Sequence, residues 1–239
     1  MNNLIAKEML VTPTISIRLP TIGEIMDYGE HDYYHAVSSL CATPFDIMVQ
    51  LDDAGINFNN VSEFDVFGMM FRGMTPEMLG MVFAQKIDSS TFILDRNEEN
   101  NEPIIRDTES NIVIDKFVQS QISDTLRKIH LFKKNDKKAG NEATRKYLIE
   151  RARKKLERER RKPQVNRLEN QIIAMVNTPE FKYDFETVQH LNIYAFNASV
   201  RQVQKRIEYS QVMGGYYAGT IDIQKLNMEK LDWLSSGNQ

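Results

Sequence analysis

The sequence predicts an α+β protein that is mainly α-helical, with a small antiparallel β-meander, several helices and a protruding basic helix. Three observations support this fold class. Over most of the chain, apolar residues recur at helical spacing between residues that begin and end helices. Residues 91–114 instead hold three short runs rich in β-branched residues, separated by polar turns. Residues 127–162 hold 16 of the 30 Lys and Arg residues in a helical pattern.

Length and composition indicate a chain that buries a hydrophobic core. Its 239 residues are 41% hydrophobic and 9% aromatic, which is too apolar for a disordered chain. No apolar run approaches the roughly 20 residues needed to cross a bilayer, and the first residues lack the pattern of a secretory signal. Cys41 is the single cysteine, which excludes an internal disulfide and a cysteine-based zinc cluster. We therefore expect a protein of the reducing cytoplasm, without a membrane partner.

The first 85 residues predict one strand followed by short helices. We expect an irregular start up to residue 13, and then a half-buried strand at 14–19, where Ile15, Ile17 and Leu19 alternate with polar residues. The signals that bound the helices after it are a Thr-Pro start at 43–44, a left-handed end at Gly55, a capping box at 62–65 and a second Thr-Pro start at 75–76.

The middle of the chain predicts the meander and two helices. The runs at 91–94, 103–106 and 111–114 are the expected strands. Asp115 then caps a helix that extends to about residue 131, with an apolar face made by Val118, Ile122, Leu126 and Ile129. A polar loop at 133–141 leads to the basic helix.

The basic helix is predicted at 142–162, where Pro163 stops it. Its apolar stripe is thin and is made by Ala143, Tyr147, Leu148, Ala152 and Leu156. Three acid–base pairs at the i, i+4 spacing each stabilise it by a few tenths of a kcal/mol; they are Glu142–Lys146, Glu150–Lys154 and Glu157–Arg161. The segment is therefore expected to be helical without much packing.

The C-terminal part predicts further helices and completes a division into three regions. We expect a helix at 165–177, a helical region at 184–213 that breaks near Asn192 and ends at Gly214-Gly215, and a short helix at 227–234 with Trp233. The predicted regions are an acidic α+β domain with the small sheet at 1–131, a loop and basic helix at 132–162 that serve as an arm or linker, and a C-terminal helical region at 163–239.

Charge is distributed very unevenly. The net charge is −13 over residues 1–126, +11 over 127–162 and −1 over 163–239. Three interpretations of the basic helix follow: a solvated helix or one packed along a narrow seam, a helix docked on an acidic surface of this chain or of a partner, or a nucleic-acid-binding helix. Single-strand binding is disfavoured because Phe132 and Tyr147 are the only aromatic residues in this window, whereas duplex binding needs only the charge. The candidate partner-binding residues are Lys146, Arg151, Arg153, Lys154, Lys155, Arg158, Arg160 and Arg161.

A methionine cluster lies near three phenylalanines, Phe67, Phe71 and Phe83. Its members are Met69, Met70, Met74, Met78 and Met81. They predict either a plastic core between two short helices or a docking groove that adapts to its partner, because methionine repacks easily.

The sequence predicts no catalytic, metal or cofactor site, and hence a protein that is not an enzyme. His31 and His35 have the spacing of two ligands on one helical face, but a third would have to come from Glu24 or Asp27. The position after His31, where a zinc-protease helix carries glutamate, holds Asp32. The glycines at 214–219 lack the Gly-Lys-Ser/Thr ending of a phosphate loop. A polar helix face, a buried Cys41 thiol and a helix end are the simpler interpretations.

Three stretches together carry a resemblance to a known class of proteins. They are LPTIGEI at 19–25 with Tyr28-Gly29 and Tyr33-Tyr34; IVID at 112–115 leading to LRKIH at 126–130; and NIYAFNASV at 192–200 through GGYYAG at 214–219 to LDWL at 231–234. Over most of its length the chain resembles proteins encoded in the tail-gene region of tailed phages and prophages of Gram-positive bacteria. It is loosely similar to their baseplate-hub assembly proteins and tail-assembly chaperones.

The resemblance implies a non-enzymatic protein that holds a tail component during virion assembly or forms part of the tail. The implied partner is a phage tail or baseplate protein or a second copy of this chain, in the host cell cytoplasm or in the virion tail. The alternative is a nucleic-acid-binding regulatory protein that uses the basic helix at 142–162.

Overall fold

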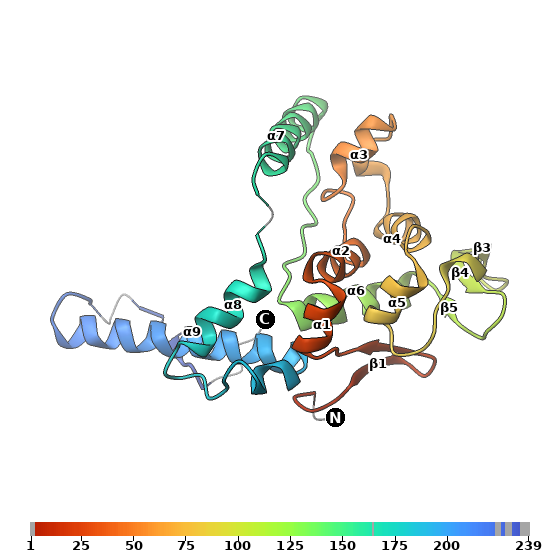
Figure 1. Ribbon diagram of the computed structural model, residues 1–239. Helices are drawn as coiled ribbons and strands as arrows, with labels where there is room; N and C mark the ends of the chain where they lie inside the picture. The colour runs from red at the N-terminus through yellow and green to blue at the C-terminus, as the bar shows by residue number, and fades with distance from the viewer. Residues whose placement is uncertain (1–2, 164, 223–225, 228–230, 235–239) are drawn as a thin grey trace.

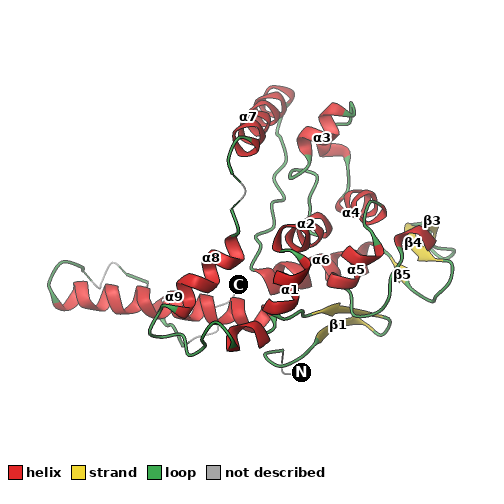
Figure 2. Ribbon diagram, viewed as in Figure 1, coloured by secondary structure: helices red, strands yellow, loops and turns green. Residues whose placement is uncertain are grey.

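The computed structural model describes residues 3–163, 165–222, 226–227 and 231–234. It confirms the α+β, mainly helical class, with two small antiparallel sheets (Figure 2). Most helices and the strands gather in a central body. A pair of helices forms an arm above this body, and one long helix extends away from it to the side (Figure 1).

The chain begins with a hairpin that the sequence predicts only in part. β2 (Ile15–Arg18) is the predicted strand, and Ile15 and Ile17 are buried. β1 (Glu8–Thr12) pairs antiparallel with it, so the expectation of an irregular start is wrong there. β1 has little alternation of its own, and its backbone hydrogen bonds to β2 stabilise it as a strand.

Short helices follow, as predicted, and the structure adds two 3₁₀ turns. The elements are α1 (Ile22–Tyr28), α2 (Glu30–Leu40), α3 (Met48–Asp53), η1 (Phe58–Asn60), α4 (Glu63–Arg72), α5 (Pro76–Val82) and η2 (Ser89–Thr91). The capping box of Ser62 with Asp65, the Thr75 cap and the left-handed Gly55 are confirmed. Thr43 does not begin α3. Its hydroxyl instead binds the Asp46 carboxylate and the Asn135 carbonyl, across a turn that precedes the helix.

The predicted meander is confirmed as a three-stranded antiparallel sheet. β3 (Phe92–Arg96), β4 (Pro103–Asp107) and β5 (Val113–Ile114) pair in chain order. α6 (Lys116–His130) follows, with the Asp115 side chain accepting a hydrogen bond from the backbone of Val118. Leu131 ends it in a left-handed conformation.

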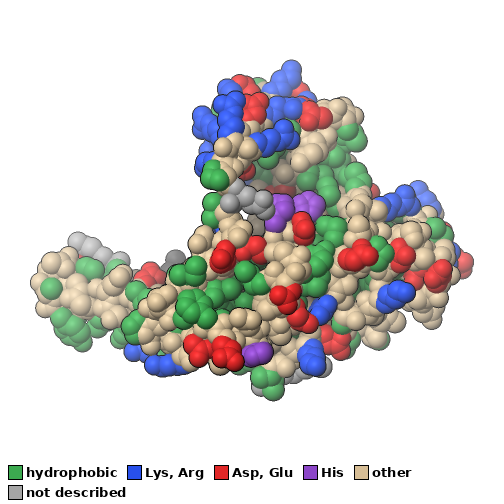
Figure 3. Space-filling view, in the orientation of Figure 1, with side chains coloured by type: hydrophobic (Ala, Val, Ile, Leu, Met, Phe, Trp, Pro, Cys, Tyr) green, Lys and Arg blue, Asp and Glu red, His purple; other side chains and the backbone are tan. Residues whose placement is uncertain are grey.

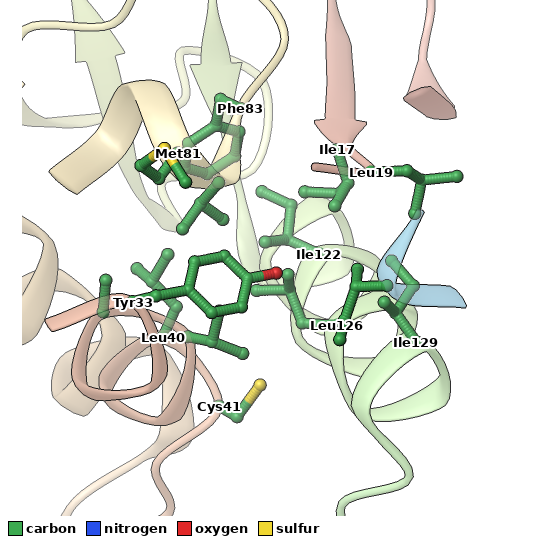
Figure 4. Packing of buried hydrophobic residues seen from close by; sticks show 14 of the residues in the cluster. Ile17, Leu19, Tyr33, Leu40, Cys41, Met81, Phe83, Ile122, Leu126 and Ile129 are labelled. Carbon is green, nitrogen blue, oxygen red and sulfur yellow. The ribbon is translucent and has the colours of Figure 1, made fainter. Parts of the chain in front are cut away.

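α6 lies at the centre of the main core. α6 contacts the hairpin, α2 and α4. Its apolar face belongs to the same core as Tyr33 and Phe83, and Leu126 is buried with them (Figure 4). The buried Arg127 guanidinium also donates to the carbonyl of Cys41 at 2.6 Å, which satisfies the C-terminal end of α2. A second, smaller hydrophobic cluster lies apart from this core, between α3, η1, α4 and the basic helix.

The remaining elements are α7 (Glu142–Arg160), α8 (Arg167–Val176), η3 (Thr187–His190) and α9 (Ile193–Tyr217). The predicted break near Asn192 is confirmed, because its side chain caps α9. The helical segment predicted before the break is wrong, because only the 3₁₀ turn η3 forms there. The predicted end at Gly214-Gly215 is wrong: α9 continues through both glycines and stops before Gly219, which has the left-handed φ of +71°. The predicted helix at 227–234 falls partly outside the described residues.

Candidate functional site

α7 is the basic helix of the arm, and it packs on α3 along a narrow seam. Ile149 is only 5% exposed and contributes to the small cluster with Met48, Val49 and other residues of α3 and its neighbours. The predicted stripe is wrong at Ala143, which is exposed, and at Tyr147, which is 62% exposed. The predicted apolar stripe omits Ile149, although its spacing to Ala152 and Leu156 gives the helical period that identifies it.

Ion pairs fix the same face of α7 to the acidic end of α3. Asp52 accepts from Arg145 at 3.3 Å and from Arg153 at 2.9 Å. Arg153 also reaches Asp53 at 2.5 Å. The hydrogen bond from Arg153, with further contributions from Arg145, lowers the pKa of Asp52. Part of the positive charge of α7 is therefore compensated within the chain.

The acid–base ion pairs along the surface of α7 differ in part from those that the sequence predicts. Glu150 and Lys154 form the predicted pair at 2.6 Å. Glu142 binds Arg145 at 2.7 Å instead of Lys146, and Lys155 lies 3.7 Å from Glu159. The helix begins at the Asn141 cap, whose side chain accepts from the backbone of Thr144 at 2.8 Å.

The opposite face of α7 presents cations to solvent. Tyr147, Arg151, Lys154 and Arg158 follow one another at spacings of three and four residues, which places them on one side of a helix. Basic side chains cover this part of the arm (Figure 3). Of the predicted binding residues, Arg153 turns toward α3 and the other seven are exposed. Within the described chain, those without an ion pair are Lys146, Arg151, Arg158, Arg160 and Arg161.

The five methionines do not line one groove. Met74 and Met81 are buried in the main core, and Met78 packs against it. Met70 packs against the small cluster, and Met69 is 47% exposed. Their division between two packing regions favours the interpretation as a core.

The structure tests the metal site considered for His31 and His35 and the burial expected of Cys41. The rings of His31 and His35 lie 6.5 Å apart, and no group of three His, Cys, Asp or Glu side chains able to hold a metal occurs among the described residues. Cys41 is buried, and this burial raises the pKa of its thiol to about 12. No helix in the described part of the chain is long and apolar enough to cross a membrane.

Part of the chain matches a known family model. Residues 159–238 match the family model described as YomV second domain, a phage-associated family. The match begins at the end of α7 and covers α8, η3 and α9. The search of curated proteins and the search of solved structures each found no match. The C-terminal part of the chain is therefore similar to a phage-associated domain.

Proposed function

We propose that this is a non-enzymatic phage protein that positions a tail or baseplate component during assembly in the host cell cytoplasm. The observation that carries the proposal is the outward face of α7, a row of exposed cations on a helix whose other face is fixed to the protein. The similarity of residues 159–238 to a phage-associated domain supports the phage context.

The contacts that hold α7 in place favour a binding role for this helix over the role of a merely solvated helix. Ile149 and the pairs of Arg145 and Arg153 with Asp52 hold the helix in place. Cations on the outer face recur every three or four residues, about 4.5–6 Å along the axis. A rigid row of charges loses less conformational freedom on binding than charges on a mobile tail. Such a row selects an acidic partner surface and fixes its orientation.

The test is a double charge reversal on the outer face, Arg151→Glu with Arg158→Glu. Pull-down from infected cells should recover a tail or baseplate protein with the wild-type chain, and the purified pair should bind more weakly as salt rises. The double variant should lose this binding while its circular dichroism stays unchanged. The control reverses two exposed cations outside α7, Arg72 on α4 and Lys86 in the loop after α5.

Binding of the recovered protein that survives reversal of Arg151 and Arg158 would refute the role of this face. A strictly monomeric protein in sedimentation, with no tail or baseplate partner recovered, would refute the assembly role itself.

A second candidate function is binding of nucleic acid by the same face. Exposed Tyr147 lies in line with Arg151 and Arg158, neither of which has an ion pair in the described chain. Duplex binding requires only phosphate contacts by such cations. A mobility-shift assay with duplex DNA at low salt separates the two functions: a shift that the double reversal abolishes would favour nucleic acid, and no shift would exclude it.

A further inference from the structure

A pocket of about 580 Å³ lies between α2, the end of α6 and the start of α8. Histidine side chains are visible in the hollow beneath the α7 arm (Figure 3). The volume is within the range of about 300–1,000 Å³ that is typical of small-molecule sites. The pocket also lies between the N-terminal part of the chain, represented by α2 and α6, and the region similar to the phage-associated domain. Ligand sites are common between two parts of a protein that meet in this way.

One wall of the pocket is aromatic and rigid. Tyr34, His130 and Phe132 contact one another with ring centroids 5.5–6.4 Å apart. His130 is fixed at both ring nitrogens, 2.8 Å from the Leu126 carbonyl and 2.8 Å from the Tyr33 hydroxyl. The wall is therefore preorganised to receive a planar ring by stacking or by edge-to-face contact.

The polar groups around this wall differ in whether they are already bound. The carboxylate of Glu30 is occupied, because its two oxygens accept the backbone N–H groups of Leu168 and Glu169 at 3.2 and 3.1 Å. The side chains of His31, His35, Arg167 and Gln171 line the pocket and make no hydrogen bond or ion pair within the described chain. The available groups are thus a guanidinium, two imidazoles and an amide, which favour an anionic ligand.

We propose that this pocket binds a small organic anion that carries an aromatic ring. The ring lies against Tyr34, His130 and Phe132, and the anionic group faces Arg167 and the two imidazoles. Arg167 is the residue that sets the preference for negative charge, because it supplies the guanidinium among the residues that line the pocket. The site is separate from the outward face of α7 and is independent of the proposed assembly role.

The probe is 8-anilinonaphthalene-1-sulfonate, an aromatic anion whose fluorescence rises in an apolar site. We expect one probe per chain, with the affinity weakened about fivefold or more by Arg167→Gln, because a charge-assisted contact is lost. Gln171→Trp, which fills the pocket from α8, should abolish the signal. The matched controls Arg72→Gln and His190→Gln change exposed residues outside the pocket and should leave the affinity unchanged.

Two comparisons make the test specific. The uncharged analogue N-phenyl-1-naphthylamine should bind more weakly than the sulfonate and should not respond to Arg167→Gln. Displacement of the sulfonate by indole-3-acetate would indicate a carboxylate ligand, and displacement by adenosine monophosphate would indicate a phosphate. Equal binding of charged and uncharged probes, no effect of Gln171→Trp, or failure of both competitors would overturn the proposal.

Discussion

His130 is a buried imidazole with both ring nitrogens bound within the chain. Its Nδ1 atom must donate, because its partner is the Leu126 carbonyl, and its Nε2 atom therefore accepts from the Tyr33 hydroxyl. The ring is neutral in this arrangement, and burial lowers its pKa to about 4. The sequence did not identify this residue, because Tyr33 is 97 positions away and nothing local marks the contact.

We expect His130 to destabilise the fold as the pH falls. Its pKa is about 4 in the folded protein and 6.5 in an unstructured peptide, so between these values the unfolded chain binds the proton first. The contribution of neutral His130 to the free energy of unfolding is complete above pH 6.5. It is lost progressively toward pH 4, by up to about 3 kcal/mol. Urea unfolding at pH 7, 6 and 5 measures the loss.

The control for this prediction is His130→Gln, which cannot titrate. The variant is expected to be less stable than the wild type at pH 7, but its free energy of unfolding should fall less steeply as the pH is lowered. Parallel curves for the two proteins would assign the acid sensitivity to other groups.

At the scale of elements, one buried residue of α7 and a set of ion pairs hold α7 against α3. The helix itself follows from local signals: the Asn141 cap, the acid–base pairs and Pro163. The orientation of α7 on α3 does not follow from local signals, because Asp52 and Arg153 are 101 positions apart. The sequence predicts docking on an acidic surface of this chain as one option but does not indicate which carboxylates are used.

Ile149→Ala is expected to loosen this seam. Removal of a buried isoleucine side chain usually costs about 2–5 kcal/mol, and we expect the lower end because the cluster around Ile149 is small. Hydrogen exchange should quicken in α7 and α3, and denaturant unfolding should give the loss. Tyr147→Ala, on the exposed face of the same helix, should change stability by less than about 0.5 kcal/mol. Equal effects of the two substitutions would contradict the observed orientation.

Asp52→Asn is expected to weaken the same seam in a manner that depends on salt. Its carboxylate is partly exposed and binds both Arg145 and Arg153, so we expect a loss of about 1 kcal/mol at low salt. The loss should shrink near 1 M salt, where the screening length is about 3 Å. Asp27→Asn, at an exposed carboxylate on α1 without an ion pair in the described chain, is the control and should show little effect at either salt concentration.

At the scale of the whole molecule, Glu30 connects the N-terminal body to the region similar to the phage-associated domain. It belongs to α2, yet its carboxylate accepts two backbone N–H groups in the first turn of α8, which would otherwise lack partners. A carboxylate at this position is also favoured by the dipole of α8. This contact closes one side of the pocket.

Glu30→Ala should therefore increase hydrogen exchange at the start of α8 and leave α4 unchanged. The expected cost is about 1 kcal/mol, as for the loss of a helix cap. Asp32→Ala is the matched control, because Asp32 lies exposed in the same turn of α2 and makes no hydrogen bond to α8. If the two substitutions leave α8 equally protected from exchange, Glu30 does not hold the two parts together.

The sequence by itself determined the class of the fold, the β3–β5 meander and most helix boundaries. These depend on interactions within a few residues, such as the caps of Ser62, Asp115 and Asn192, so local chemistry is sufficient. Only the tertiary structure decided that β1 is a strand, that Ile149 faces α3 and that a pocket forms beneath the arm. Those features depend on backbone pairing or on contacts between residues distant in the chain, which periodicity and composition do not specify.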